Sequence, residues 1–210
     1  MEANNVLNKI IEFRNTIFEL LKKKAESHKI HFKKKDNNIH SLLKLVHKKN
    51  KNIHRELFFV IRDLPIYYDL INNVKIINLM KCLLDSNIID VSHESSIFRI
   101  DSSFNPKRQQ DWHQDYPYIL GSKPGIATWT PINDISKSMG SPLLIPRSHE
   151  KAEKVTLTKK HSKYDPNTLK ILEAKKLILK YKNNIIPSMN IKAGDTIIMH
   201  GFLLHRSGKN

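Results

Sequence analysis

Apolar side chains recur at helical spacing near the start of the chain. They are separated mostly by three or four positions, and Lys, Glu and Asn fill many of the gaps. They are Val6, Ile10, Phe13, Ile17, Leu20 and Leu21. This spacing places the apolar side chains on one stripe, so it predicts an amphipathic helix of about 18 residues whose stripe packs into a core.

The following segments continue the helical pattern with interruptions. Residues 28–40 are polar and basic, which is typical of a loop. Helices are expected over residues 41–49 and over about residues 67–85. Pro65 stands just before the second of these, where proline is tolerated because the first helical positions need no backbone N–H donor.

The pattern changes near residue 95, where short apolar segments alternate with Pro, Gly, Asn and Asp. The segments are SIFRI (96–100), GIATWTPI (125–132), SPLLIP (141–146), MNIKAGDTIIMH (189–200) and GFLLH (201–205). Such a series is typical of a β-sandwich or barrel. We therefore predict an α+β fold, in which a helical region over residues 1–94 packs on a barrel or jelly roll over residues 95–210. A Lys-rich insertion at 151–182, helical over 167–181, interrupts the barrel.

Composition places the 210-residue chain among soluble globular proteins. Hydrophobic residues make up 40% and charged residues 27%, which argues against a disordered chain. The single cysteine, Cys82, excludes an internal disulfide and a Cys-rich zinc module, and we expect it to be buried and inert. No apolar run approaches the length of a membrane span, and the N-terminus lacks the pattern of a signal peptide. A cytoplasmic location is expected.

The formal net charge is +16, and its distribution matters more than its size. Residues 1–63 hold 15 basic and 7 acidic residues, and residues 151–182 hold 10 basic and 3 acidic. Residues 64–150 hold 8 basic and 9 acidic residues, so the candidate chemistry described next lies outside the basic segments. The excess is nearly all Lys and accompanies abundant Ile and Asn, as a compositional bias would produce. Nucleic acid is therefore not favoured as a partner, although a polyanion site remains an alternative.

The strongest chemical feature is the sequence Trp112-His113-Gln114-Asp115. Residues two apart in a strand point to the same face, so His113 and Asp115 can aim an imidazole and a carboxylate at one point. His200 and His205 follow a Gly-Asp turn near the C-terminus, and a barrel can bring such distant strands together. Two histidines and one carboxylate form the metal-binding triad of non-haem iron(II) oxygenases.

Each of these residues also has a plainer interpretation. The pair formed by His113 and Asp115 can be a surface ion pair, and His205 can be an ordinary core histidine. His200 competes with His205 for the third ligand position. His149, in the sequence PRSHE, is expected to shape a loop rather than to bind metal.

Four motifs in order resemble the phytanoyl-CoA dioxygenase-like family. They are WHQD, GIATWTPIND, GSPLLIPRSHE and GDTIIMHGFLLHRS, and together they cover roughly residues 95–210. The resemblance implies a double-stranded β-helix, the jelly-roll barrel also found in cupins, with Fe(II) and 2-oxoglutarate as cofactors. It implies His113, Asp115 and His205 as the metal ligands, the last of them in a His-x-Ser motif. The segment PRSHE resembles the family's Pro-Gly-Ser-His turn, with Arg147 at the glycine position.

The resemblance also suggests residues around 2-oxoglutarate. Trp129 matches a position that lines the co-substrate pocket, although a place in the barrel core is equally compatible. Ser207 shares a strand face with His205 and can bond the far carboxylate. Arg99 precedes the His-x-Asp motif on a segment that can face the cavity, and it is the least favoured of the three. The family's arginine for the distal carboxylate lies on a strand beyond His205. The sequence ends at Asn210, so we expect either that the natural chain continues through this last strand or that co-substrate binding is impaired.

The resemblance predicts a dioxygenase that uses O₂ and 2-oxoglutarate to hydroxylate a small organic substrate, releasing succinate and CO₂. Asp115 favours hydroxylation, because related halogenases replace this carboxylate with a small residue. The alternative is a catalytically impaired barrel that serves as a binding module, with a polyanion as one candidate partner. A metal hydrolase is less favoured, since no general base is evident beside the motif. Neither the substrate nor the oligomeric state follows from the sequence.

Overall fold

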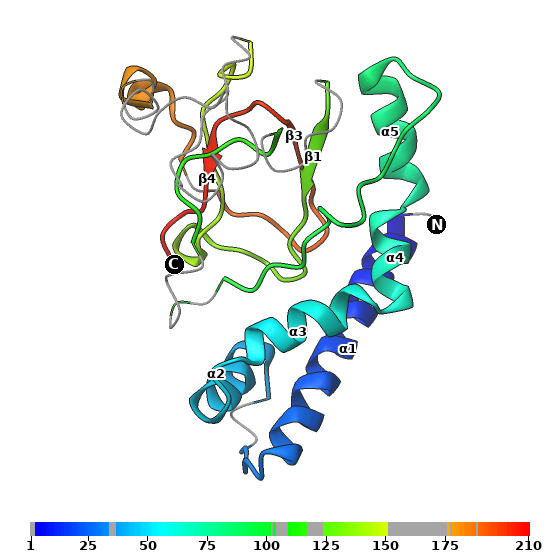
Figure 1. Ribbon diagram of the computed structural model, residues 1–210, viewed down its shortest axis with the longest axis vertical. Helices are drawn as coiled ribbons and strands as arrows, with labels where there is room; N and C mark the ends of the chain where they lie inside the picture. Colours follow the sequence, from blue (N-terminus) through cyan, green and yellow to red (C-terminus); the bar gives the residue numbers. More distant parts are fainter. Residues whose placement is uncertain are drawn as a thin grey trace. The chain divides into compact units, whose positions relative to one another are not determined.

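The chain divides into two compact units, Met1–Phe104 and Asn105–Asn210 (Figure 1). Helices α1 to α5 lie in the first unit, and strands β1 to β4 lie in the second. The computed structural model describes residues 3–33, 37–101, 103, 109–116, 124–150, 176, 178–187 and 189–210.

The first unit is built on the amphipathic helix that the sequence predicts. The helices are α1 (Ala3–Ser27), α2 (Ile39–Lys49), α3 (Ile53–Arg62), α4 (Pro65–Ile71) and α5 (Val74–Leu84). Helix α1 contacts α2 and α4, and α3 contacts both α2 and α4. The stripe of α1 is buried at Ile10, Phe13, Ile17, Leu21 and Ala25, which confirms its predicted role in the core.

Helix ends explain where the sequence prediction differs from the structure. Asn38 begins α2 as an N-cap, since its side-chain oxygen accepts a hydrogen bond from the N–H of Ser41. The single helix predicted over about residues 67–85 is wrong, because the chain breaks at Asn72 and Asn73. Asn73 caps the new helix α5 by accepting from the N–H of Lys75, a local bond that competes with helix continuation. Helix α3 was not predicted.

The second unit contains two antiparallel two-stranded sheets. Strand β1 (Ile126–Trp129) pairs with β3 (Ile197–His200), and β2 (Leu143–Leu144) pairs with β4 (His205–Arg206). Isolated bridges join further extended segments, at His113 with His205, Ile135 with Ile191, and Leu144 with Ile186. The hydrophobic core of this unit contains Trp112, Ile145 and Leu204.

The described residues do not form the closed barrel that the sequence analysis predicts. The mixed helix-and-sheet class is correct, but the described sheets are small and remain separate. Segment 96–100 is not a strand, and only parts of the other apolar segments join a ladder. Apolar segments bounded by turn residues indicate extended backbone, but ladder hydrogen bonds require a neighbour in register, which a local pattern does not specify.

Two local predictions have different outcomes. Cys82 is exposed on α5 rather than buried, which corrects the expectation for this thiol. Most of the insertion, residues 151–175 and 177, lies outside the described residues, while residues 178–180 are helical.

Among the described helices, none combines the length and apolar character needed to cross a membrane.

Candidate metal centre

Backbone pairing places His113 and His205 side by side. The N–H of His113 donates to the carbonyl of His205 at 2.9 Å, and the N–H of His205 donates to the carbonyl of His113 at 3.0 Å. Residues directly opposite each other in an antiparallel pair project their side chains to the same face. The two imidazole rings accordingly lie with their centroids 4.2 Å apart.

Asp115 completes a cluster of three potential ligand side chains. Its Oδ1 lies 3.8 Å from Nε2 of His113 and 3.7 Å from Nε2 of His205. These distances are longer than a hydrogen bond, so the three atoms are not bonded to one another. They face a common space instead. One ligand atom from each residue lies within 4.8 Å of the others. Both histidines are buried, while the Asp115 side chain is 27% exposed, so the carboxylate marks the more open side of the cluster.

Hydrogen bonds on the far side of each ring assign its tautomer. Nδ1 of His113 lies 2.7 Å from the carbonyl oxygen of Asp111, and Nδ1 of His205 lies 3.0 Å from that of Leu203. A carbonyl only accepts, so each Nδ1 carries the proton and donates. Each Nε2 of a neutral ring then presents a lone pair toward Asp115, which is the form that binds a metal.

His200 takes part in a different arrangement. Its Nδ1 accepts the backbone N–H of Phe202 at 3.1 Å, and its ring stacks on His149 with centroids 5.1 Å apart. Burial lowers the pKa of His200, and the neighbouring His149 lowers it further. Of the two histidines that compete in the sequence for the third position, the structure brings His205 into the cluster with Asp115.

The three residues suggested for 2-oxoglutarate lie in different surroundings. Trp129 ends β1 opposite Ile197 and is half-buried. The Ser207 hydroxyl accepts the N–H of Gln110 at 3.1 Å. Arg99 belongs to the first unit, where its guanidinium pairs with Asp101 at 2.9 Å.

Arg206 follows His205 on β4, and its side chain lies away from the candidate ligands. Its guanidinium carbon is 5.7 Å from the centroid of the Trp112 ring, and Nη1 is 4.0 Å from a carboxylate oxygen of Asp111. Successive residues of a strand face opposite sides, which accounts for the separation of Arg206 from the ligand cluster.

Gln114 is a residue of the site that the sequence analysis did not single out. It lies between His113 and Asp115 and is only 1% exposed. Its side-chain Nε2 donates to the carbonyl of Phe202 at 2.7 Å, which ties the His-x-Asp segment to the turn before His205. The sequence offered one signal for Gln114. If His113 and Asp115 face the metal, alternation of side chains turns the residue between them toward the core, where a polar side chain needs a partner.

Two histidines on bridged segments and the nearby carboxylate of Asp115 make a donor set suited to a 2-His-1-carboxylate metal centre. The chain belongs to the phytanoyl-CoA dioxygenase (PhyH) family, whose model matches residues 10–210. The match extends well beyond residues 95–210 and includes most of the helical unit. Among curated proteins, no relative of the chain is detected. Family membership points to an iron-dependent oxygenase acting on a small molecule.

Proposed function

We propose that the protein is an Fe(II)- and 2-oxoglutarate-dependent dioxygenase that hydroxylates a small organic substrate and releases succinate and CO₂. The observation that carries this proposal is the convergence of His113, Asp115 and His205 on one space. Family membership supports the same reaction class independently of that geometry.

The chemistry of the donor set fits Fe(II). Two neutral imidazoles and one carboxylate suit a divalent iron that must keep open positions for a co-substrate and O₂. His113 and His205 would bind through Nε2, and Asp115 would bind through its carboxylate. When bound together, Fe(II), 2-oxoglutarate and O₂ supply the oxidising power that converts a substrate C–H bond to C–OH.

The chain's own residues orient these ligands and limit the entry of water. The carbonyls of Asp111 and Leu203 hold the two rings by their Nδ1–H groups. The rings are buried, whereas Asp115 is partly exposed, which leaves one side of the cluster for approach by small molecules. An Asp at position 115, rather than a small residue, supports hydroxylation over halogenation.

Trp129 and Ser207 are our candidates for contact with 2-oxoglutarate. The Ser207 oxygen accepts from Gln110, so its own hydroxyl hydrogen remains a donor for a carboxylate. The Trp129 ring offers an apolar wall.

An anaerobic titration with Fe(II) and 2-oxoglutarate tests the proposal. Chelation of the iron by the keto acid gives a weak visible charge-transfer band, and we expect the band in the wild-type chain. His113→Ala and Asp115→Ala should each abolish it. His149→Ala is the matched control, since it also removes an imidazole from this unit but no proposed ligand. Failure of the wild-type chain to bind Fe(II), or a band that persists in both ligand variants, would refute the assignment.

A binding module for a polyanion is the second candidate, and one observation favours it. Helix α2 contains no acidic residue and exposes Lys44, Lys48 and Lys49. Binding to nucleic acid that weakens steeply with salt and is unchanged by His113→Ala would support this alternative.

A further inference from the structure

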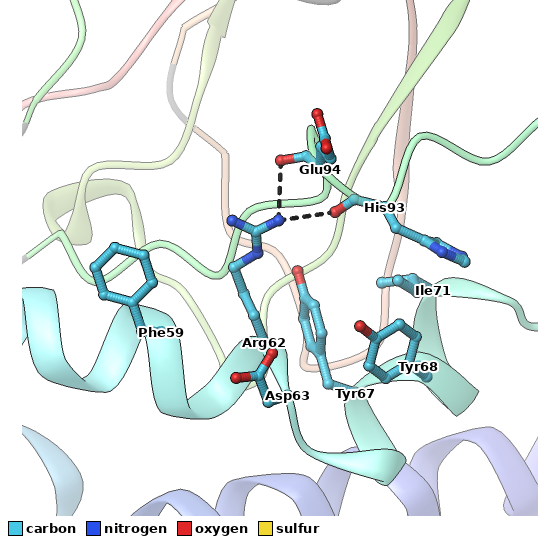
Figure 2. A pocket seen from close by; sticks show the side chains of 8 residues that line it. All are labelled: Phe59, Arg62, Asp63, Tyr67, Tyr68, Ile71, His93 and Glu94. Atoms are coloured by element: carbon cyan, nitrogen blue, oxygen red, sulfur yellow. Dashed lines mark hydrogen bonds between the residues drawn. The ribbon is translucent and has the colours of Figure 1, made fainter.

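A cleft of about 270 Å³ lies within the helical unit, away from the metal-binding cluster in sequence. The end of α3, helix α4 and the segment at residues 93–94 form its walls (Figure 2). The residues used in the argument are Phe59, Arg62, Tyr67, Tyr68, His93 and Glu94, which all belong to the first unit.

Tyr67 places a polar group at the bottom of this cleft. The residue is only 7% exposed, and its ring lies against Phe13 with centroids 5.8 Å apart. Its hydroxyl points into the cleft, beside Arg62 (Figure 2). Within the part of the chain that the structure describes, no group forms a hydrogen bond with this hydroxyl. Most of the Tyr67 side chain is buried while its hydroxyl opens onto the cleft, so a ligand bound there can accept its hydrogen bond in place of water.

The Tyr67 hydroxyl can serve only as a neutral group at physiological pH. Burial raises the pKa of Tyr67 to about 12, despite the opposing effect of Arg62. The phenol therefore keeps its proton and is available as a hydrogen-bond donor.

Arg62 supplies a second donor group held in a fixed position. Its Nη2 donates to the carbonyls of His93 and Glu94, both at 3.2 Å. The guanidinium carbon also lies 5.2 Å from the centroid of the Phe58 ring. These contacts occupy Nη2 and leave the N–H groups of Nη1 and Nε for another acceptor. A half-buried guanidinium beside a phenol donor favours a carboxylate.

Aromatic rings flank the two donors. Phe59 is 53% exposed and Tyr68 is 42% exposed, although both are large side chains. Tyr68 is held edge-to-face against His93, with ring centroids 5.4 Å apart. The carboxylates of Asp63 and Glu94 also line the cleft, but these residues are exposed, so water and salt screen their charges.

We propose that this cleft is a binding site for a small aromatic carboxylate. Arg62 and Tyr67 hold the carboxylate, and Phe59 and Tyr68 contact the aromatic body. This site is additional to the proposed metal centre and does not depend on the reaction assigned to it.

Titration of the ¹⁵N-labelled full-length chain with sodium benzoate, before any metal is added, tests the site by NMR. We expect saturable shifts at the Arg62 side-chain Nε–H and at the backbone amides of Tyr67, Tyr68 and Glu94, with a dissociation constant in the millimolar range. Benzamide has nearly the same shape without the charge and should bind at least about fivefold more weakly. Shifts confined to the surroundings of His113 and His205, or no saturable shift, would overturn the proposal.

Tyr67→Phe then removes the hydroxyl donor while keeping the ring. We expect benzoate affinity to fall about tenfold, as for the loss of one hydrogen bond to a charged group. Tyr181→Phe is the matched control, because it deletes a tyrosine hydroxyl from the other unit and should leave benzoate affinity unchanged. Thermal unfolding of both variants checks that they remain folded. Equal affinity in the wild-type and Tyr67→Phe chains would overturn the proposed role of this hydroxyl.

Discussion

Replacement of Gln114 by Met should weaken both the fold of the second unit and its metal affinity. The Gln114 side chain is 1% exposed and donates to the carbonyl of Phe202 at 2.7 Å. Methionine is close to glutamine in length and volume, so the change removes the hydrogen bond with little cavity. The Phe202 carbonyl then loses its buried donor, which costs about 2 kcal/mol. This corresponds to about a 30-fold change in the folding equilibrium constant.

Chemical denaturation followed by tryptophan fluorescence measures this change. Both tryptophans of the chain, Trp112 and Trp129, lie in the second unit, so their emission reports the unfolding of the unit that contains Gln114. The midpoint should fall while the denaturant slope stays constant, since the surface exposed on unfolding is unchanged. Gln110→Met is the control, because Gln110 is exposed.

The same variant separates stability from the geometry of the site. Gln114 lies between two proposed ligands, and a residue that holds ligands in place typically contributes 10–100-fold, roughly, to metal affinity. We expect a loss of this order in Fe(II) affinity under conditions in which the variant is fully folded. An unfolding free energy within about 0.5 kcal/mol of the wild type would refute the reasoning, since that is the range of ordinary surface substitutions.

Three further predictions concern the backbone and the pH dependence of stability. Arg147 has a φ of 62°, in the left-handed region that glycine adopts without strain. Arg147→Gly should therefore be about 1 kcal/mol more stable than Arg147→Ala in the same denaturation assay, and equal stabilities would contradict this. Burial lowers the pKa of His200 below 6.5, so at mildly acidic pH the unfolded chain binds a proton that the folded chain does not. The free energy of unfolding should therefore fall as the pH drops below 6.5, and His200→Gln should flatten this pH dependence. Hydrogen bonds from Lys24 and Asn50 lower the pKa of Glu56, so the stability that Glu56 contributes should be present above pH 4.5 and disappear at lower pH. Glu56→Gln should lower the free energy of unfolding by up to about 1 kcal/mol at neutral pH. Thermal unfolding measures this change, and an unchanged melting temperature would contradict it.

Local patterns in the sequence predicted the features that depend on neighbouring residues. The stripe of α1 follows from three- and four-residue spacing, and its burial at Phe13 and Leu21 confirms it. The break between α4 and α5 is also local, because Asn73 caps α5, although helical spacing alone predicts one continuous helix. The common direction of His113 and Asp115 was expected from strand alternation. In the structure their side-chain atoms do face one another, but only His113 makes a bridge and the chain bends at Asp115.

Tertiary structure decided which distant residues meet. His200 and His205 both follow apolar segments, and no local pattern distinguishes them as partners of His113. The mutual backbone hydrogen bonds of His113 and His205 make the choice, because pairing in register brings one imidazole to Asp115 and leaves the other stacked on His149.

The sequence by itself determined the helical first region, the turn-rich second region and the residue types of a metal-binding cluster. Only the tertiary structure decided the register that assembles the cluster, the burial of Gln114 and the cleft around Tyr67. The physical reason is that helical periodicity and strand alternation are properties of adjacent residues. Strand register and cavities depend instead on contacts between segments that are far apart along the chain.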